Sequence, residues 1–221
     1  MSESLNIEQL FPISVKTYCC RVQDHTDDLH SEEAVIISKA IDKRRFEFST
    51  GRLCARKALQ QIGIDICFLA QGKNGAPIWP DQITGSISHS SKWAAAVISN
   101  TKDIMTVGFD IETVNRISDG ILKRIITEKE KELLNKKDKQ NAQIYAALIF
   151  SAKEAFYKAL SKLYSKTLRF MDVSIIPNND SPEFEIELND ELNSFLKNVR
   201  PFCRYFIHEN DIFTAITFFR V

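Results

Sequence analysis

Apolar and polar positions alternate along this chain with two different periods, which predict two kinds of element. A period of two, typical of strands that bury one face, runs through several short segments. It predicts strands at residues 14–21, 85–90, 93–99, 104–112, 171–176, 183–188, 203–208 and 212–219. A period near 3.6 predicts helices at residues 31–40, 42–62, 127–136 and 141–163.

The segments between these elements indicate how they are connected. Residues 72–81 are rich in glycine and proline and are expected to form a loop. The polar residues 100–103 are expected to be a tight turn that joins strands 93–99 and 104–112 in a hairpin. Each half then mixes helices with antiparallel strands in a loosely similar order. The expected fold class is therefore α+β, with a boundary near residues 100–103.

The composition is that of a globular chain with a sizeable core, since 44% of its 221 residues are hydrophobic and 26% are charged. The 29 basic and 29 acidic side chains cancel, which leaves no net field that would attract nucleic acid or an anionic membrane. The five cysteines include no CxxC pair, as is typical of reduced thiols. Without a signal-peptide pattern or a membrane-length apolar run, the chain is expected to be cytoplasmic.

Two carboxylates fall on one face of the predicted strand 104–112. Large apolar residues alternate there with Thr106, Gly108, Asp110 and Glu112, so the period of two puts both carboxylates on the same side. Neighbouring carboxylates repel each other unless a cation neutralises them, and Mg²⁺ prefers such oxygen ligands together with substrate phosphates. Gly108 is expected to leave room beside the pair. The alternative is that both carboxylates belong to a solvated strand end.

The predicted helix 141–163 carries a second group of charges beside its apolar stripe. The expected core stripe consists of Leu148, Ala152, Ala155, Ala159 and Leu163. Glu154 and Lys158 share a different face. They are either an ordinary i,i+4 ion pair on the helix surface or a functional pair. In the functional reading, Glu154 is a third metal ligand or a base, and Lys158 neutralises charge on a phosphoryl group.

Basic side chains suited to a phosphate occur earlier in the chain. On the predicted helix 42–62, Arg45, Arg52 and Arg56 form one stripe, which either holds a phosphate or is simply the solvated side of the helix. In the segment 85–90, His89 and the serine hydroxyls are suited to donating hydrogen bonds to phosphate or adenosine. The alternative for His89 is a satisfied histidine at a strand end.

Four segments, taken in order, resemble the surfactin-type 4′-phosphopantetheinyl transferases, and most of all the branch of enterobactin synthase component D. They are GAPIWP, SISH, VGFDIE and FSAKEAFYK at residues 75–80, 86–89, 107–112 and 150–158. A basic, aromatic helix with the Gly-Arg step Gly51-Arg52 also matches, so the resemblance covers about residues 43–158. It implies a pseudo-twofold α/β monomer in which coenzyme A lies between an N-terminal half, 1–103, and a C-terminal half, 104–221.

The resemblance also implies roles for individual residues. The positions that match the metal ligands of the family are Asp110, Glu112 and Glu154. The positions implied to contact coenzyme A are Arg52 and His89 at the 3′-phosphate, Ser88 and Pro77 at the nucleotide, and Lys153 and Lys158 at the phosphates. Glu130 matches a further acidic position, but the alternative is a capping box, in which Glu130 only reaches back to the backbone of Thr127.

The sequence departs from the pattern of the family at three places. Phe150 stands where many relatives have tryptophan, Ala76 where some have lysine, and residues 164–168 where a glycine-containing loop is common. The departures leave the implied metal site intact and bear on the preference for a carrier protein.

The expected function is Mg²⁺-dependent transfer of phosphopantetheine from coenzyme A to a serine of an acyl, peptidyl or aryl carrier protein, with 3′,5′-ADP as the leaving group. Mn²⁺ is expected to substitute for Mg²⁺. The expected catalytic residues are Asp110, Glu154 and Lys158, and Arg45 and Arg56 join the residues expected to bind the cofactor. Two alternatives remain: a non-catalytic binding module for coenzyme A or carrier, and a coenzyme A-dependent acyltransferase, which would gain little from a metal at the diphosphate.

Overall fold

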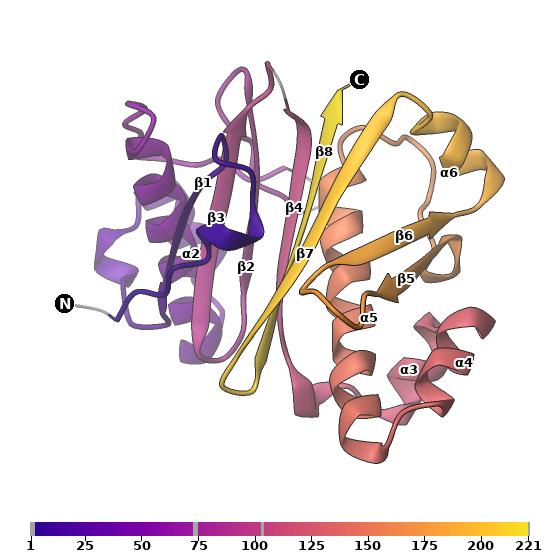
Figure 1. The fold of residues 1–221 in the computed structure, drawn as a ribbon. Helices are drawn as coiled ribbons and strands as arrows, with labels where there is room; N and C mark the ends of the chain where they lie inside the picture. The colour runs from indigo at the N-terminus through magenta and orange to yellow at the C-terminus, as the bar shows by residue number, and fades with distance from the viewer. Residues whose placement is uncertain (1–2, 73–74, 103, 221) are drawn as a thin grey trace.

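The described residues form two three-stranded antiparallel sheets and a smaller two-stranded one, and one long helix packs against each of the larger sheets (Figure 1). The computed structural model describes residues 3–72, 75–102 and 104–220. Lys73 and Asn74 in the expected loop, and Asp103 in the expected turn, lie outside the described residues. Within the described part, no helix is long and apolar enough to cross a membrane.

The first sheet has β3 in the middle, antiparallel to β1 on one side and to β2 on the other. Helix α2 covers one face, where its buried Ala55 and Ala58 pack in one cluster with Ala94 and Ala96 of β3. Small side chains on both surfaces let the helix approach the sheet closely. The bounds are β1 Lys16–Arg21, α1 Ser31–Ile36, α2 Asp42–Gln60, β2 Ile83–His89 and β3 Trp93–Asn100.

The second sheet has β8 in the middle, between β4 and β7, and α5 packs on β4 and β8. The smaller pair of β5 and β6 and the helices α3, α4 and α6 lie around it on the same side of the molecule (Figure 1). The bounds are β4 Ile104–Thr113, α3 Asp119–Ile125, α4 Glu128–Asn135, α5 Lys139–Leu160, β5 Val173–Pro177, β6 Phe184–Leu188, α6 Asp190–Phe195, β7 Val199–His208 and β8 Asp211–Arg220. Short 3-10 helices are η1 Glu8–Leu10, η2 Thr26–Asp28, η3 Val114–Arg116 and η4 Phe170–Asp172.

The two sheets share an apolar core and meet along β2 and β4. Val107, Phe109 and Ile111 of β4 are buried in the same cluster as Ala95 and Val97 of β3. At the junction, side-chain hydroxyls of β2 make the bonds to β4, in place of a backbone ladder. The pairs are Thr84 Oγ1 with Thr106 Oγ1 at 3.3 Å, and Ser86 Oγ with the Phe109 carbonyl at 3.2 Å.

Helix α5 lies very close to β4 because β4 carries a glycine at the point of contact. A Cβ on Gly108 would lie 1.9 Å from the Ala155 carbonyl oxygen and 2.8 Å from the Ala159 nitrogen. The expectation that Gly108 leaves room beside the carboxylates is therefore wrong, since the helix backbone fills that room. Its real effect is to bring the side chains of α5 against the polar face of β4.

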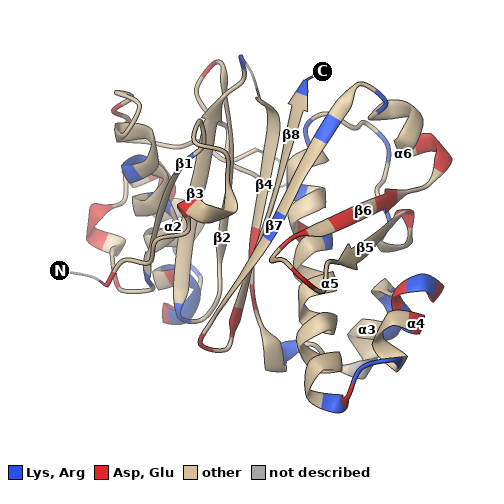
Figure 2. Ribbon diagram, in the orientation of Figure 1, with Lys and Arg blue, Asp and Glu red and all other residues tan. Residues whose placement is uncertain are grey.

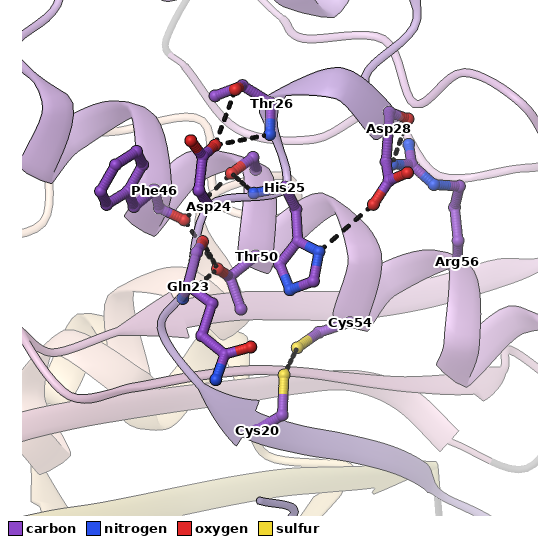
Figure 3. A network of polar contacts seen from close by, with 11 residues as sticks. Cys20, Gln23, Asp24, His25, Thr26, Asp28, Phe46, Thr50, Cys54 and Arg56 are labelled. Atoms are coloured by element: carbon purple, nitrogen blue, oxygen red, sulfur yellow. Dashed lines mark hydrogen bonds and ion pairs between the residues drawn. The ribbon is translucent and has the colours of Figure 1, made fainter. Parts of the chain in front are cut away.

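The segment after β1 is tied to α2 by hydrogen bonds to the helix side chains (Figure 3). Thr50 Oγ1 accepts from the Gln23 nitrogen at 3.1 Å and donates to the Gln23 carbonyl at 2.8 Å. Deeper in the core, Cys20 Sγ lies 3.7 Å from Cys54 Sγ. All five cysteines are free, and only Cys67 is exposed, so the other four act as small apolar core residues.

The predicted elements are confirmed, with shifted ends, but their pairing is partly wrong. The hairpin expected between residues 93–99 and 104–112 does not form, because β3 already has β1 and β2 on its two edges and β4 pairs with β8. Leu163, expected in the core stripe of the long helix, lies beyond the end of α5 and is 41% exposed. Helices α3 and α6 were not predicted, although Ser118 and Asn189 cap their N-termini.

Candidate active site

Asp110 is the centre of a polar network in which β2, β4, α5 and β8 meet. Its side chain is buried, and its Oδ1 accepts from Ser88 Oγ at 2.8 Å and from Lys158 Nζ at 2.6 Å. Its Oδ2 accepts from Ser151 Oγ at 2.9 Å, and that hydroxyl also contacts Thr214 Oγ1 at 2.8 Å. The solvated strand end is therefore excluded as the explanation of Asp110. Figure 2 marks the acidic stretch of β4 in red.

Glu112 and Glu154 share the electrostatic field of Asp110. Burial, and then the charge of Asp110, raise the pKa of Glu112 to about 7. The same two causes raise the pKa of Glu154. Arg116 and then Lys158 lower the pKa of Glu112, and Lys158 lowers that of Glu154, but these cations do not offset burial and the neighbouring carboxylates. The cluster from β4 and α5 is therefore electrostatically strained, and a cation would relieve the strain.

The donor set of this cluster suits a hard divalent cation, although its side chains are not arranged as a finished metal site. Among the described residues, no three histidine, cysteine or acidic side chains are placed so as to hold a metal ion together. In Asp110, Oδ1 accepts two hydrogen bonds, whereas Oδ2 keeps one lone pair beyond its bond to Ser151. A divalent cation there would be held by Asp110, Glu112 and Glu154, and its charge would offset the charge of Asp110, which after burial raises the pKa values of both glutamates.

Lys158 connects the two halves of the site. Its ammonium group donates to Asp110 and, at 2.9 Å, to Ser88 Oγ on β2, and the side chain remains 31% exposed. No ion pair joins Lys158 to Glu154 in the described part of the chain, so the ordinary i,i+4 surface pair is not what these residues form. Lys158 is instead a cation held at the junction of the sheets, with one side open to solvent.

His89 lies at the end of β2 between Arg44 and Glu47 of α2. Its Nε2 is 2.6 Å from Arg44 Nη1, and its Nδ1 is 3.5 Å from Glu47. Burial, Arg44 and Lys158 lower the pKa of His89 to about 4, so the imidazole is neutral at pH 7 and Nε2 accepts the hydrogen bond from Arg44. Sequence reasoning missed Arg44, although it directly precedes Arg45. The helical spacing placed Arg45, and not Arg44, on one face with Arg52 and Arg56.

The low pKa of His89 predicts a specific pH dependence. The ordinary pKa is 6.5 and the folded value about 4, so between these pH values the unfolded chain binds more protons. Stability contributed by His89 is therefore lost as the pH falls from 6.5 toward 4 and is complete above 6.5. We expect the His89 ring resonances in an NMR titration, assigned with a His89→Asn variant, to move with a midpoint below pH 5. A midpoint near 6.5 would contradict the buried position.

The three arginines of the predicted stripe lie in different environments. Arg45 is half-buried, and its Nη1 lies 3.6 Å from Asp42 Oδ1 on the same helix. Arg52 is buried, and its Nε lies 3.4 Å from Glu33 Oε1. Arg56 Nη1 donates to Glu33 Oε2 at 2.9 Å. The structure therefore separates Arg45 from Arg52 and Arg56, which share a buried carboxylate that the sequence did not indicate.

Lys153 is not brought to the polar network around Asp110. Its side chain is fully buried, and its ammonium group donates to Glu130 Oε2 at 2.8 Å and to the carbonyls of Ile125 and Phe170. These three acceptors satisfy all three of its N–H donors and hold the ammonium group away from Asp110, so a role of Lys153 at the phosphates stays a prediction. Glu130 also accepts from the Thr127 nitrogen, which confirms the capping box.

The buried pair of Lys153 and Glu130 predicts a loss of stability when one partner is removed. Lys153→Met leaves the Glu130 carboxylate buried without a counter-charge, which should lower the free energy of unfolding by about 3 to 5 kcal/mol. The double variant with Glu130→Gln should recover part of that loss. Urea unfolding measures both. Unchanged stability together with weaker coenzyme A binding would instead support a role at the phosphates.

Pro77 lines a cavity of about 490 Å³ between the two halves, together with Trp79, Ser86, Lys158 and Lys162. Lys162 Nζ donates to the Pro77 carbonyl at 2.8 Å, which joins the loop of the first half to the end of α5. The polar network of Asp110 therefore opens, at Lys158, into a cavity large enough for part of an organic ligand.

Comparisons with known proteins identify the family. The model described as the 4′-phosphopantetheinyl transferase N-terminal domain matches residues 31–99, and that of the 4′-phosphopantetheinyl transferase superfamily matches residues 106–210. The transferase Npt of Nocardia iowensis is 33% identical over 183 residues, which are 82% of this chain and 78% of Npt. Enterobactin synthase component D of Salmonella typhi is 29% identical over 79% of this chain and 72% of its own length.

Among solved structures, the holo-[acyl-carrier-protein] synthase of Neisseria meningitidis aligns with 52% of this chain and 98% of its own, at 22% identity and a TM-score of 0.45. The family matches at residues 31–99 and 106–210, and the similarity to Npt over 82% of this chain, agree with the motifs in the sequence. The chain therefore belongs to the 4′-phosphopantetheinyl transferase family, in the branch of enterobactin synthase component D.

Proposed function

We propose that the network around Asp110 is the site at which this transferase moves phosphopantetheine from coenzyme A to a serine of an acyl, peptidyl or aryl carrier protein. One observation carries the proposal: the close approach of α5 to β4 brings Asp110, Glu112, Glu154 and Lys158 together beside the cavity between the halves. Phosphoryl transfer depends on such positioning and on charge stabilisation more than on covalent catalysis.

The residues that would hold Mg²⁺, or Mn²⁺ in its place, are Asp110, Glu112 and Glu154. A bound divalent cation would neutralise the diphosphate and favour departure of 3′,5′-ADP. Lys158, released from Asp110, is close enough to donate to a phosphate oxygen near Ser88. Glu154, which would lie beside the ion, is proposed to accept the proton of the carrier serine.

The two halves take different parts of coenzyme A in this proposal. Residues 1–103 bind the adenine and the 3′-phosphate, through Arg44, Arg52 and His89, and residues 104–221 supply the metal ligands and the base. Arg44 replaces Arg45 in this set because Arg44 contacts His89, whereas Arg45 pairs with Asp42. Arg56 is not proposed to contact coenzyme A directly, because its guanidinium donates a hydrogen bond to Glu33.

The protein is proposed to act as a cytoplasmic monomer. The free cysteines, four of them buried, are compatible with a reducing compartment.

Carrier modification tests the proposal directly. The purified chain, incubated with coenzyme A, Mg²⁺ and an apo carrier protein, should add about 340 Da to the carrier serine, the increment of one phosphopantetheine transfer. A chelator should stop the reaction, and Mn²⁺ should restore it. Binding of coenzyme A without any mass increase would indicate a non-catalytic module. Acyl transfer that survives the chelator would indicate an acyltransferase.

A further inference from the structure

A buried carboxylate in the first half binds two arginines at once. Glu33, in the first turn of α1, is 0% exposed. Its Oε2 accepts from Arg56 Nη1 at 2.9 Å and from the His30 nitrogen at 3.1 Å. Its Oε1 accepts from the Leu69 nitrogen at 3.2 Å and lies 3.4 Å from Arg52 Nε. Two backbone N–H groups therefore fix the carboxylate, so the position of Glu33 is set by the fold.

Arg52 is buried with little of its hydrogen-bonding capacity used. Its side chain is 5% exposed, and Nε and Nη2 have no hydrogen-bond partner among the described residues. The contacts that the described residues give the guanidinium are the ion pair with Glu33 and the ring of Phe48, 4.4 Å away. Each buried donor without a partner costs about 1 to 3 kcal/mol, so a residue kept in this state is explained by a ligand that completes its bonds.

The unsatisfied guanidinium belongs to the basic region at the end of β2. Burial lowers the pKa of Arg52, Glu33 opposes that change, and the charges of Arg56 and Arg44 lower the pKa further. Arg44 in turn contacts His89. One carboxylate against two arginines leaves a net positive charge in the buried cluster, which suits a phosphate. Figure 3 shows Arg56 beside Asp28, whose carbonyl accepts from Arg56 Nη2 at 3.2 Å.

We infer that Glu33 is a positioning residue for the 3′-phosphate of coenzyme A, because it fixes the direction of the Arg52 guanidinium without touching the ligand itself. The inference rests on the proposed function, which places that phosphate at Arg52. Arg56 anchors the other oxygen of Glu33, so the carboxylate cannot turn away from Arg52. Because Glu33 already orders the Arg52 side chain in the free protein, binding of the phosphate does not cost the conformational entropy of that side chain.

The inference is tested by comparing coenzyme A with 3′-dephospho-coenzyme A, which lacks only the phosphate in question. In Glu33→Gln, the dissociation constant for coenzyme A, measured by calorimetry, should rise about 10-fold, the loss expected for charge-assisted hydrogen bonds. The constant for the dephospho form should stay within about twofold. In an Arg52→Gln background, Glu33→Gln should add nothing to the ratio of the two constants, since it acts through Arg52.

A second variant covers the case in which Glu33→Gln does not fold. Removing Glu33 alone leaves the buried Arg52 and the half-buried Arg56 without a counter-charge, whereas Glu33→Gln combined with Arg56→Met keeps the net charge of the cluster. This charge-matched variant should also lose the preference for coenzyme A. Glu130→Gln is the control, because it perturbs a buried carboxylate in the second half and should leave the ratio unchanged.

The outcomes separate the inference from the proposed function. A wild-type chain that prefers coenzyme A, with the same preference in the Glu33 variants, overturns the role of Glu33 alone. A wild-type chain that binds both compounds equally overturns the phosphate assignment and the role of Glu33 with it. Equal weakening of both compounds in the Glu33 variants shows a merely structural role. Failure of carrier modification, by contrast, bears on the transfer reaction and leaves these binding constants interpretable.

Discussion

Replacing Asp110 by asparagine should lower the rate of carrier modification by at least about 10³-fold, the largest effect we expect from one atom exchange in this chain. The substitution keeps the volume of a buried side chain but removes the charge that Lys158 and a divalent cation would share. It also replaces an acceptor of Ser88 or Ser151 by an amide donor, which cannot accept their hydrogen bonds. The measurement is the initial rate of mass gain on the carrier.

The control for this variant is Asp27→Asn, which removes the same charge from an exposed position in η2. It should change neither the rate nor the melting temperature. Asp110→Asn should remain folded, because Lys158 is 31% exposed and can turn its ammonium group to solvent. Rapid transfer by folded Asp110→Asn would remove Asp110 from the catalytic residues.

Gly108→Ala should damage both stability and activity, although it adds a single methyl group. The new Cβ would overlap the Ala155 carbonyl oxygen at 1.9 Å, and backbone atoms of a packed helix cannot move aside cheaply. Overpacking of this kind should lower the free energy of unfolding by about 3 kcal/mol. Any outward shift of α5 moves Glu154 and Lys158 away from Asp110, so transfer should fall more than the folded fraction does. Urea unfolding and the carrier assay together measure this.

Gly120→Ala is the matched control, because a Cβ there would meet nothing closer than Ser118 Oγ at 3.8 Å. Alanine is the better helix former, so this variant in α3 should be neutral or more stable by up to about 1 kcal/mol. If Gly108→Ala behaved like Gly120→Ala, the close contact between α5 and β4 would not be what assembles the site.

The local pattern of the sequence was sufficient to locate most elements and the acidic face of β4. Alternation in residues 105–112 predicted that Asp110 and Glu112 share a side, and the face that carries Gly108 and Asp110 does meet α5. Pairing between strands was harder to predict. A short turn favours a hairpin between neighbours, but β3 has only two edges, and a strand more than a hundred residues away pairs with β4.

The individual roles of charged residues depended on contacts that spacing does not encode. Lys153 and Lys158 lie on the same helix, yet Lys153 is buried and pairs with Glu130, whereas Lys158 pairs with Asp110. Glu33 could not be found from the sequence, because its partners Arg52 and Arg56 follow about twenty residues later and nothing local marks it as buried. The capping box of Thr127 and Glu130 was predictable because both of its bonds are local.

The central claim is that acidic side chains of β4 and α5 bind one divalent ion together with the diphosphate of coenzyme A. The most direct measurement is a crystal structure with Mn²⁺ and coenzyme A, in which anomalous scattering locates the metal. The account predicts one manganese peak within about 2.3 Å of oxygens from Asp110, at least one of Glu112 and Glu154, and the diphosphate. A peak away from Asp110, or coenzyme A bound with its diphosphate remote from β4, would contradict it.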